Sequence, residues 1–243
     1  MSDSSPILFI ADLHLSDQSP DIYQRFKEFI GTKALNSRAL YILGDLFEYY
    51  LGDDAMSPLC LQVCEDLKKL NQNHGVETYF LHGNRDFLVG GQFESKSRTK
   101  ILSDPYLLEL NTETIILTHS DQLCTDDIPY QKARTQLRDP QWQQWFLNLS
   151  IEERVEFAKK ARKQSKEHTQ KASQEIMDVN STEVQKLFES FQLKTLLHGH
   201  THRPAFHYHQ HYNQDYLRMV LGDWHHQSSY IEYQNGTFKL LTC

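Results

Sequence analysis

The chain has 243 residues, a formal net charge of −7 and four cysteines. This length suits one α/β domain with a sizeable insertion and gives no sign of an independent second core. The acidic balance argues against a general nucleic-acid binder. No stretch approaches the roughly 18 consecutive apolar residues that a membrane span needs. The segment before Ile7 lacks the basic region and apolar run of a signal peptide, so we expect none.

Five short apolar runs have the length and bulk of buried strands, and a polar cluster follows each of them. The runs are residues 7–10, 40–43, 79–81, 115–117 and 196–197. The clusters are Asp12-Leu13-His14, Gly44-Asp45, Gly83-Asn84-Arg85-Asp86, Thr118-His119 and Gly199-His200-Thr201-His202. Because side chains at strand ends can converge on one place, these clusters predict a shared site.

The first two clusters offer oxygen and nitrogen donors to a cation. Asp12 and His14 are two residues apart, so an extended segment places both side chains on one side, where one cation can take both. Gly44 permits a tight exit from its strand, and the two oxygens of the Asp45 carboxylate could bridge two metals. Taken alone, a Gly-Asp pair is more often a turn or a helix cap.

The third cluster combines a neutral amide oxygen from Asn84 with the guanidinium of Arg85, whose planar fork suits a phosphate. By itself it would most often be a loop. Two divalent cations roughly 3.5–4 Å apart can clamp both the attacking and the leaving oxygens of a phosphoryl group. The clusters together therefore predict a two-metal phosphoesterase site.

Histidines follow the last two runs. Taken singly, His119 is more often an ordinary hydrogen-bonded histidine than a ligand. His198, His200 and His202 alternate, so an extended segment points all three to one side, and spacing alone leaves open which two bind a metal. The three histidines that we expect to be solvated bystanders are His207, His209 and His211.

The segment between His119 and His200 is far longer than one strand–helix–strand step requires, and about 130–191 reads as mostly helical. Trp142, Trp145, Phe146 and Leu149 recur at i, i+3, i+4 and i+7, which predicts one apolar helix face. Its aromatic side chains could lie at a membrane boundary, or they could pack against the rest of the protein.

Basic residues outnumber acidic ones in the part of this segment that follows. They are Arg154, Lys159, Lys160, Arg162, Lys163, Lys166 and Lys171. A basic amphipathic stretch beside aromatic residues suits an anionic bilayer surface or a diphosphate substrate with acyl chains, although a solvated helix face has the same composition.

The order D-x-H, G-D, G-N-x-D, H and G-H-x-H resembles the calcineurin-like metallophosphoesterase superfamily. The longer stretches 10–15, 40–48, 82–88, 176–180 and 198–204 are similar to one family within it, a manganese-dependent family of lipid A biosynthesis. The resemblance implies an α/β class fold, a four-layer αββα sandwich over residues 1–243, with a helical cap inserted at 125–192.

The resemblance also implies a ligand set of two Mn2+ ions per chain. The first metal would take Asp12, His14, Asp45 and His202, and the second would share Asp45 and add Asn84, His119 and His200. This assignment leaves His198 as a packing residue or as a residue behind the ligands. Asp, Asn and His donors would also accept iron or zinc, so the donor types alone do not select the metal.

Arg85 stands where the superfamily usually has a histidine, which is thought to protonate an alkoxide leaving group. Arginine cannot do that at neutral pH. A pyrophosphate bond expels a phosphate monoester, which needs charge neutralisation more than a proton. Arg85 therefore favours pyrophosphate cleavage over phosphodiester cleavage, with Asp45, Asn84 and Arg85 as the catalytic residues.

Substrate contacts implied by the resemblance come from the core and the cap. They map to Asn84, Arg85 and His200 in the core, and to Asp127, Ser165, Thr169, Lys171 and Ala172 in the cap. The chain departs from the family at several of these places. Thr169 and Ala172 replace an asparagine and a lysine, Lys171 lies one position early, and Ser120 stands where a glycine is usual.

The implied reaction is hydrolysis of the pyrophosphate bond of UDP-2,3-diacylglucosamine to UMP and 2,3-diacylglucosamine 1-phosphate. A hydroxide activated by two metals would attack the α-phosphorus. The rivals are a soluble nucleotide pyrophosphatase or phosphodiesterase on the same scaffold, and a non-catalytic protein-binding platform. We expect a cytoplasmic monomer with reduced cysteines, bound peripherally to the anionic inner-membrane surface.

Overall fold

The computed structural model describes residues 5–171, 177–211, 213–225 and 228–243, and for residues 166 and 168–171 it describes the backbone alone. The strands are β1 (Ile7–Ile10), β2 (Ala39–Leu43), β3 (Glu77–Leu81), β4 (Thr99–Ile101), β5 (Tyr106–Glu109), β6 (Thr114–Thr118), β7 (Thr195–His198), β8 (Ala205–His211), β9 (Gln214–Val220), β10 (Ser229–Gln234) and β11 (Thr237–Thr242). All five apolar runs lie in strands, as predicted. They form β1, β2, β3, β6 and β7.

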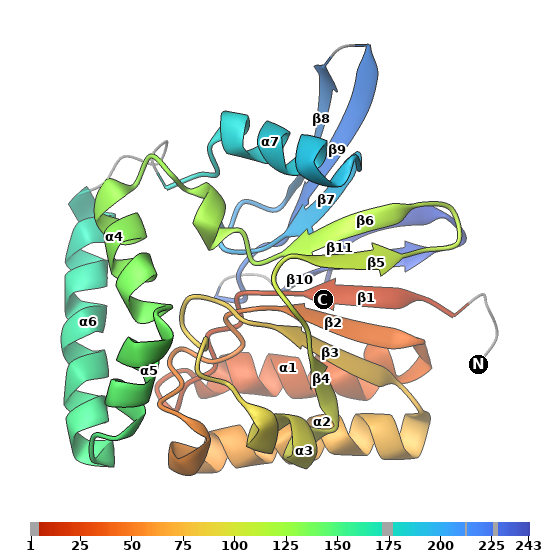
Figure 1. Cartoon of the computed structure of the whole chain (residues 1–243). Coiled ribbons are helices and arrows are strands. Elements are labelled where there is room, and N and C mark those ends of the chain that lie inside the picture. The colour runs from red at the N-terminus through yellow and green to blue at the C-terminus, as the bar shows by residue number, and fades with distance from the viewer. Residues whose placement is uncertain (1–4, 172–176, 212, 226–227) are drawn as a thin grey trace.

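The strands form two mixed sheets (Figure 1). One sheet has the order β11-β10-β1-β2-β3-β4 and the other β5-β6-β7-β9-β8. Neighbouring strands from β1 to β4 are parallel, and so are β6, β7 and β9. Parallel neighbours end at the same sheet edge, so the loops after β1, β2 and β3 and those after β6 and β7 lie together at the two facing edges.

The helices are α1 (Pro20–Thr32), α2 (Pro58–His74), α3 (Gly91–Ser97), α4 (Ile128–Leu137), α5 (Pro140–Leu147), α6 (Ile151–Lys171) and α7 (Ser181–Phe191). In addition, short 3-10 turns occupy Ala34–Asn36, Asp53–Ala55 and Asp121–Leu123. No helix in the described part of the chain combines the length and apolar character needed to cross a membrane.

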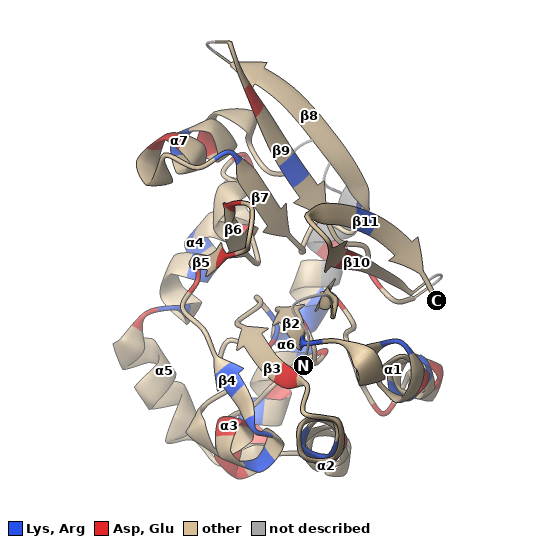
Figure 2. Ribbon diagram, turned by 90° about the vertical axis from the view of Figure 1, so that its right-hand side faces the viewer, with Lys and Arg blue, Asp and Glu red and all other residues tan. Residues whose placement is uncertain are grey.

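Alternation of side chains along the strands divides the core into layers. On β1, Leu8 and Ile10 pack with the residues of α1 and α2, whereas Ile7 and Phe9 face the second sheet. On the far side, Phe188 of α7 packs on the second sheet. The result is an α/β fold in which helices flank two facing sheets, as the view at 90° to Figure 1 shows (Figure 2).

The segment between β6 and β7 carries α4, α5, α6 and α7, so its predicted helical character is confirmed. The helices α4, α5 and α6 group beside the ends of β1 and β2 (Figure 1). The prediction of one apolar helix face through Leu149 is wrong, because α5 ends at Leu147. Ser150 and Glu153 exchange backbone-to-side-chain hydrogen bonds of 2.9 and 3.2 Å, a capping box that begins α6 and breaks the helix at Leu149.

The aromatic residues of α5 differ in their surroundings. Trp142 stacks on Phe146 at a centroid distance of 5.1 Å and contacts Phe157 of α6 and Phe87 of the core. Trp145 is 50 % exposed. Trp142 is therefore partly buried among other aromatic rings, whereas Trp145 keeps a large exposed surface.

The prediction that Arg154 belongs to a basic helix surface is wrong. Its side chain is buried, with 3 % exposed, and it donates to both carboxylate oxygens of Asp54 at 2.7 and 2.5 Å and to the carbonyl of Leu51 at 2.8 Å. These contacts fasten α6 to the loop after β2. Arg154 belongs to the internal structure and cannot be part of an anion-binding surface.

Candidate metal and phosphate site

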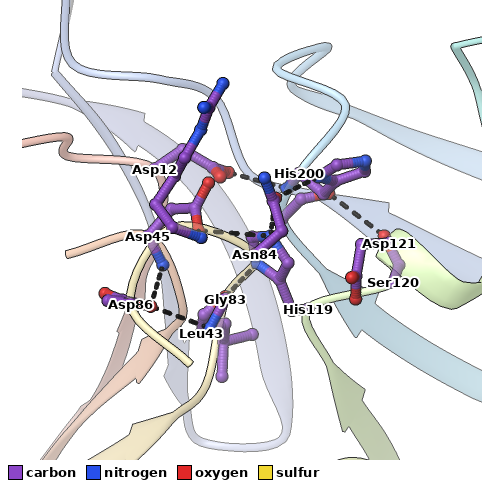
Figure 3. Close-up of polar contacts among 12 residues, drawn as sticks. Asp12, Leu43, Asp45, Gly83, Asn84, Asp86, His119, Ser120, Asp121 and His200 are labelled. Atoms are coloured by element: carbon purple, nitrogen blue, oxygen red, sulfur yellow. Dashed lines mark hydrogen bonds and ion pairs between the residues drawn. The ribbon is translucent and has the colours of Figure 1, made fainter. Parts of the chain in front are cut away.

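The polar clusters converge where the loops after β1, β2, β3, β6 and β7 meet (Figure 3). Donor atoms of Asp12, His14 and His202 lie within 4.8 Å of one another, and so do those of Asp12, Asp45 and His119. Apart from His202, these side chains are buried. The two neighbouring groups of potential ligands thus have the carboxylate of Asp12 in common.

Asp45 belongs to the second group and also faces a histidine of the first. Its Oδ1 atom is 3.6 Å from Nε2 of His119, and its Oδ2 atom is 3.9 Å from Nε2 of His14. Each carboxylate oxygen therefore faces a histidine of a different group. This arrangement is compatible with a carboxylate shared by two cations.

Asn84 joins His119 to His200. The Oδ1 atom of Asn84 is 2.9 Å from Nε2 of His119 and 2.9 Å from Nδ1 of His200 (Figure 3). All seven residues expected as ligands consequently lie in one continuous cluster. Their individual assignment to two metals stays a prediction.

The backbone at this cluster is strained. Five of the seven candidate ligands have a positive φ, a conformation that costs a non-glycine residue roughly 1–2 kcal/mol. They are Asp12 (φ 57°), His14 (52°), Asp45 (52°), His200 (69°) and His202 (56°). Because such strain collects at functional sites, where the surrounding structure maintains it, this pattern supports a functional role independently of the residue types.

Close backbone approach maintains these conformations. The amide of Asp12 donates to the carbonyl of Gly44 at 3.1 Å, and the amide of His200 donates to Oδ2 of Asp12 at 2.8 Å. Gly44 has a φ of 87°, and a Cβ atom there would come within 2.6 Å of His119 Nδ1 and of Gly83 Cα. Glycine is therefore required at position 44, where the chain packs closely against Gly83 and His119.

Asp86 organises the site from behind, a role that sequence reasoning missed. Its buried carboxylate accepts hydrogen bonds from the amides of Gly83 (2.9 Å), Asp45 (3.2 Å), Leu46 (2.7 Å) and Phe47 (3.2 Å). It thereby joins the loops after β2 and β3. Burial and the neighbouring Asp45 raise the pKa of Asp86 to about 7. In the sequence, the sign of this role was the position of Asp86 at the end of the third polar cluster.

Burial and mutual charge divide the histidines of the site into two kinds. Burial lowers the pKa of His14 well below its usual value and that of His200 to about 3. Burial also disfavours charge on His119 and His202, but Asp45 and Asp12 raise the pKa of His119 to about 8, and Asp12 and Asp223 raise that of His202 to about 10. Burial opposes the charged form of Asp12 too, yet His202 and the other histidines keep its pKa low.

These donors fit divalent metal ions. Oδ1 of Asp12 is buried and has no hydrogen-bond partner among the described residues. Nε2 of His14 and Nε2 of His202 lie 3.3 Å apart, so two imidazole nitrogens point at each other. A cation between such groups would use an orphaned oxygen and two nitrogens at once, and the mixture of carboxylate, amide and imidazole donors suits manganese, iron or zinc.

Two further carboxylates lie beside histidines among the candidate ligands, and sequence reasoning missed both. Oε2 of Glu48 lies 3.4 Å from Nδ1 of His14, and Oδ2 of Asp223 lies 3.2 Å from Nδ1 of His202. Carboxylates in this position fix the ring orientation of metal-binding histidines. A signal for Asp223 existed, because Gly222-Asp223 follows the apolar end of β9 as Gly44-Asp45 follows β2.

A cavity of about 320 Å³ opens above the cluster, between the core and the inserted helices. Candidate ligands and cap residues line it together, including Asp45, Asn84, Arg85, Tyr130, Ser165 and His200. Nη2 of Arg85 lies 3.5 Å from Oγ of Ser165, and Arg162 of α6 forms an ion pair with Glu48. An arginine of the core and an arginine of the cap therefore line the same cavity.

The other predicted contacts have mixed outcomes. Asp127 lines the cavity and also caps α4, accepting from the amide of Tyr130 at 3.0 Å. The side chains of Thr169 and Lys171 and the whole of Ala172 lie outside the described residues. His207, His209 and His211 lie on β8 and contribute nothing to the described lining of the cavity.

Ser120 and His198 form a buried pair behind the cluster. Ser120 has a φ of 83°, which explains why a glycine suits this position. Its hydroxyl lies 2.8 Å from Nδ1 of His198 and 3.3 Å from the carbonyl of Gly199. Burial and the neighbouring Arg218 lower the pKa of His198 to about 3. The neutral His198 side chain thus lies outside both ligand groups.

Residues 5–204 match the family profile described as calcineurin-like phosphoesterase. Proteins named UDP-2,3-diacylglucosamine hydrolase are similar over nearly the whole chain. The one from Chromohalobacter salexigens is 44% identical over 217 residues, covering 89% of this chain and 88% of the relative. The one from Stenotrophomonas maltophilia is 42% identical over 242 residues, covering 97% of each.

Solved structures with a related fold include an archaeal phosphodiesterase, with a TM-score of 0.46 and 12% identity over 98% of this chain and 99% of that one. The E. coli phosphoesterase Yfce has a TM-score of 0.47 and 16% identity, over 96% of this chain and 90% of its own.

Proposed function

The chain belongs to the calcineurin-like phosphoesterase family, and from this premise we propose that it is a metal-dependent hydrolase of UDP-2,3-diacylglucosamine in lipid A biosynthesis. The products are UMP and 2,3-diacylglucosamine 1-phosphate. The relatives named for this substrate supply the substrate class. The chemistry at the site supports the same reaction independently.

The observation that carries the proposal is the position of Arg85 beside the donor cluster. The amide of Arg85 donates to Oδ1 of Asp45 at 2.8 Å, and its guanidinium lines the cavity opposite Ser165. A fixed guanidinium at this point neutralises phosphate charge but cannot donate a proton to an alkoxide. Pyrophosphate cleavage, which expels a phosphate monoester, is the reaction that this arrangement suits.

The proposed ligand sets are Asp12, His14, Asp45 and His202 for one cation, and Asp45, Asn84, His119 and His200 for the other. Two divalent ions held there, Mn2+ in our proposal, would lower the pKa of water and polarise the phosphoryl oxygens. The protein's own part is to hold these donors in strained but rigid positions. Asp86 does so for the loops after β2 and β3.

Arg85 and Asn84 hold the α-phosphate over the cluster, and Arg85 stabilises the equatorial charge that develops during attack on the α-phosphorus. The diacylglucosamine phosphate then departs without needing a proton. Asp127 and Ser165 contribute contacts from the cap, and Ser165 lies within reach of Arg85. Thr169, Lys171 and Ala172 complete the proposed substrate set.

The inserted segment 125–192 serves in this proposal as a cap on the single domain formed by residues 1–243. It closes the cavity above the cluster, and Tyr130, Arg162 and Ser165 contribute to the lining. The exposed side chains of Trp145, Leu147 and Ile151 form an apolar margin at the α5–α6 turn. This margin and the lysines of α6 suit peripheral binding of a monomer to the cytoplasmic face of an anionic inner membrane.

The test compares three substrates with purified protein and Mn2+. UDP-2,3-diacylglucosamine in mixed micelles is expected to be hydrolysed to UMP, with much lower kcat/KM for ADP-ribose and bis-p-nitrophenyl phosphate. Preference for ADP-ribose would establish a soluble nucleotide pyrophosphatase instead. Lack of turnover with all three, at full metal occupancy, would favour the protein-binding platform.

A further inference from the structure

Asp178 lies in the connection between α6 and α7, where the inserted segment returns to the core, and its carboxylate meets two arginines. Its Oδ2 atom accepts from Nη1 of Arg203 at 2.9 Å, and its Oδ1 atom lies 3.6 Å from Nη1 of Arg218. The amide of Val179 donates to Oδ1 at 2.8 Å, which fixes the orientation of the carboxylate. Nothing in the reaction described above uses this group.

The two arginines come from different parts of the second sheet. Arg203 directly follows His202 in the loop after β7, and it lines the cavity. Arg218 lies on β9, beside Leu196 of β7, and its side chain is 10% exposed. Asp178 therefore contacts both the loop that carries His200 and His202 and the neighbouring strand β9.

Arg218 links Asp178, through His198, to the backbone of the loop after β7. Its Nη1 atom lies 3.3 Å from Nε2 of His198, and because a guanidinium can only donate, His198 accepts at Nε2 and carries its proton on Nδ1. That Nδ1 atom lies 2.8 Å from the carbonyl of Gly199. Gly199 precedes His200, so the network reaches the backbone of a proposed ligand.

We propose that Asp178 is a positioning residue that fastens the returning end of the cap to the loop carrying His200 and His202, through Arg203 directly and through Arg218 and His198. The cap and the ligand loop then move as one unit. These contacts do not depend on substrate identity; the Mn2+ affinity and the kinetics in the test below rest on the proposed function, whereas the hydrogen exchange does not.

Asp178 stabilises this arrangement because it faces a positive charge that is largely buried. With Asp178 neutralised, the largely buried Arg218 would lose the carboxylate that faces it, and a buried charge without its partner is costly. The protein could relieve this cost by moving the side chain of Arg218 toward water, which would break its contact with His198 just before the loop. Arg203, directly after His202, would lose the same carboxylate, so the segment that carries His200 and His202 would lose a contact at each end.

The chain offers a matched control in the same connection. Asn180 donates to both carboxylate oxygens of Asp126 at 3.0 Å, so this pair also fastens the returning end of the cap. It joins that end to the beginning of the same inserted segment, just after β6, and has no contact with Arg203 or Arg218 among the described hydrogen bonds. Asp126→Asn therefore weakens a contact between the two ends of the inserted segment without touching the loop that carries His200 and His202.

The experiment measures Mn2+ affinity and backbone hydrogen exchange at residues 199–203 in Asp178→Asn, Asp178→Glu, Arg203→Gln and Asp126→Asn. For Asp178→Asn we expect about tenfold weaker Mn2+ binding, the usual scale for groups behind metal ligands, and faster exchange at the loop. Asp178→Glu should recover part of the affinity, and Asp126→Asn should match the parent protein. Adding Arg203→Gln to Asp178→Asn should weaken binding less than the sum of the two single effects, because both remove the same contact.

The proposal would be overturned if Asp178→Asn kept the Mn2+ affinity and the loop hydrogen exchange of the parent protein. It would also be overturned if Asp126→Asn changed both quantities as much as Asp178→Asn does. If Asp178→Asn does not fold, Arg203→Gln removes the same contact at a more exposed site and decides the question. Kinetics on UDP-2,3-diacylglucosamine should show a fall in kcat that follows metal occupancy. A parent protein inactive on that lipid would refute the proposed function while leaving the affinity and exchange results to judge Asp178.

Discussion

Nε2 of His14 and Nε2 of His202 lie 3.3 Å apart, with Oδ1 of Asp12 3.5 Å from Nε2 of His202. Two neutral imidazoles cannot both accept at this distance, so in the metal-free chain one must donate. Because Asp12 and Asp223 raise the pKa of His202 to about 10, His202 carries that proton. A cation bound here has to displace it.

Metal affinity should therefore increase with pH. His202 and His119, with pKa values raised to about 10 and about 8, are protonated at pH 7 in the metal-free protein. The stability that His202 gains from its carboxylates is fully present below its unfolded pKa of about 6.5 and is lost as the pH rises through about 10. Calorimetric titration with Mn2+ in two buffers of different ionisation enthalpy should show proton release at pH 7 and tighter binding at pH 8.5. Affinity that is constant over this range would contradict the assigned protonation.

Replacement of Asp45 by alanine should strongly reduce turnover while leaving the fold intact. Asp45 faces histidines of both groups, and a metal centre supplies several kcal/mol of transition-state stabilisation, so we expect a loss on the order of a thousandfold. Asp86 still joins the surrounding loops, so the unfolding temperature should change little. Metal content and kcat are measured together, with the exposed Asp21→Ala as control. An active Asp45→Ala protein with unchanged metal content would disprove the shared-ligand assignment.

The two tryptophans of α5 should respond differently to replacement by serine. Trp142 packs against Phe146, Phe157 and Phe87, so Trp142→Ser should lower the free energy of unfolding by about 2 kcal/mol or more. Trp145 is half exposed, and Trp145→Ser should change stability by less than about 1 kcal/mol. If the exposed ring contacts lipid, Trp145→Ser should reduce activity on micellar substrate more than on a water-soluble diester. Equal losses on both substrates would show that it does not.

Replacing Ser120 by alanine or by glycine separates the effect of backbone strain on stability from that of a buried hydrogen bond. Ser120→Ala retains the φ of 83° and loses the hydroxyl that faces His198, so it should destabilise the protein. Ser120→Gly loses the same hydroxyl but relieves the strain, by about 1 kcal/mol. Chemical denaturation should therefore rank glycine above alanine. The reverse order would mean that the surrounding loop, and not residue 120, sets this conformation.

The position of attack can be read from isotope incorporation. Cleavage of the bond between the two phosphates yields UMP whichever phosphorus the hydroxide attacks, but the new oxygen enters the phosphate that was attacked. With Asn84 and Arg85 around the α-phosphate, hydrolysis in ¹⁸O-water should place the label in UMP and none in the diacylglucosamine phosphate. Mass spectrometry of both products makes the measurement. Label in the lipid product would require the diphosphate to lie in the opposite direction across the site.

Much of the site could be predicted from the sequence because its signals are local. A run of apolar residues followed by Asp, Asn or His marks a strand and the group at its end, and both are set by neighbouring residues. The five strands and the helical character of the insertion were confirmed in this way. The resemblance to a known family added the pairing of these groups, which spacing alone left open for His198, His200 and His202.

Only the tertiary structure determined which residues stand behind these groups. Asp86, Asp223 and Asp178 act on partners from other loops and strands, and no local pattern predicts which distant segment a carboxylate will meet. The same holds for Arg154, which reads as part of a basic surface but is buried against Asp54. Residue type and spacing determine which chemistry a chain can perform. Packing between distant segments determines which of its charges stay in water and which are buried as pairs that hold the site in place.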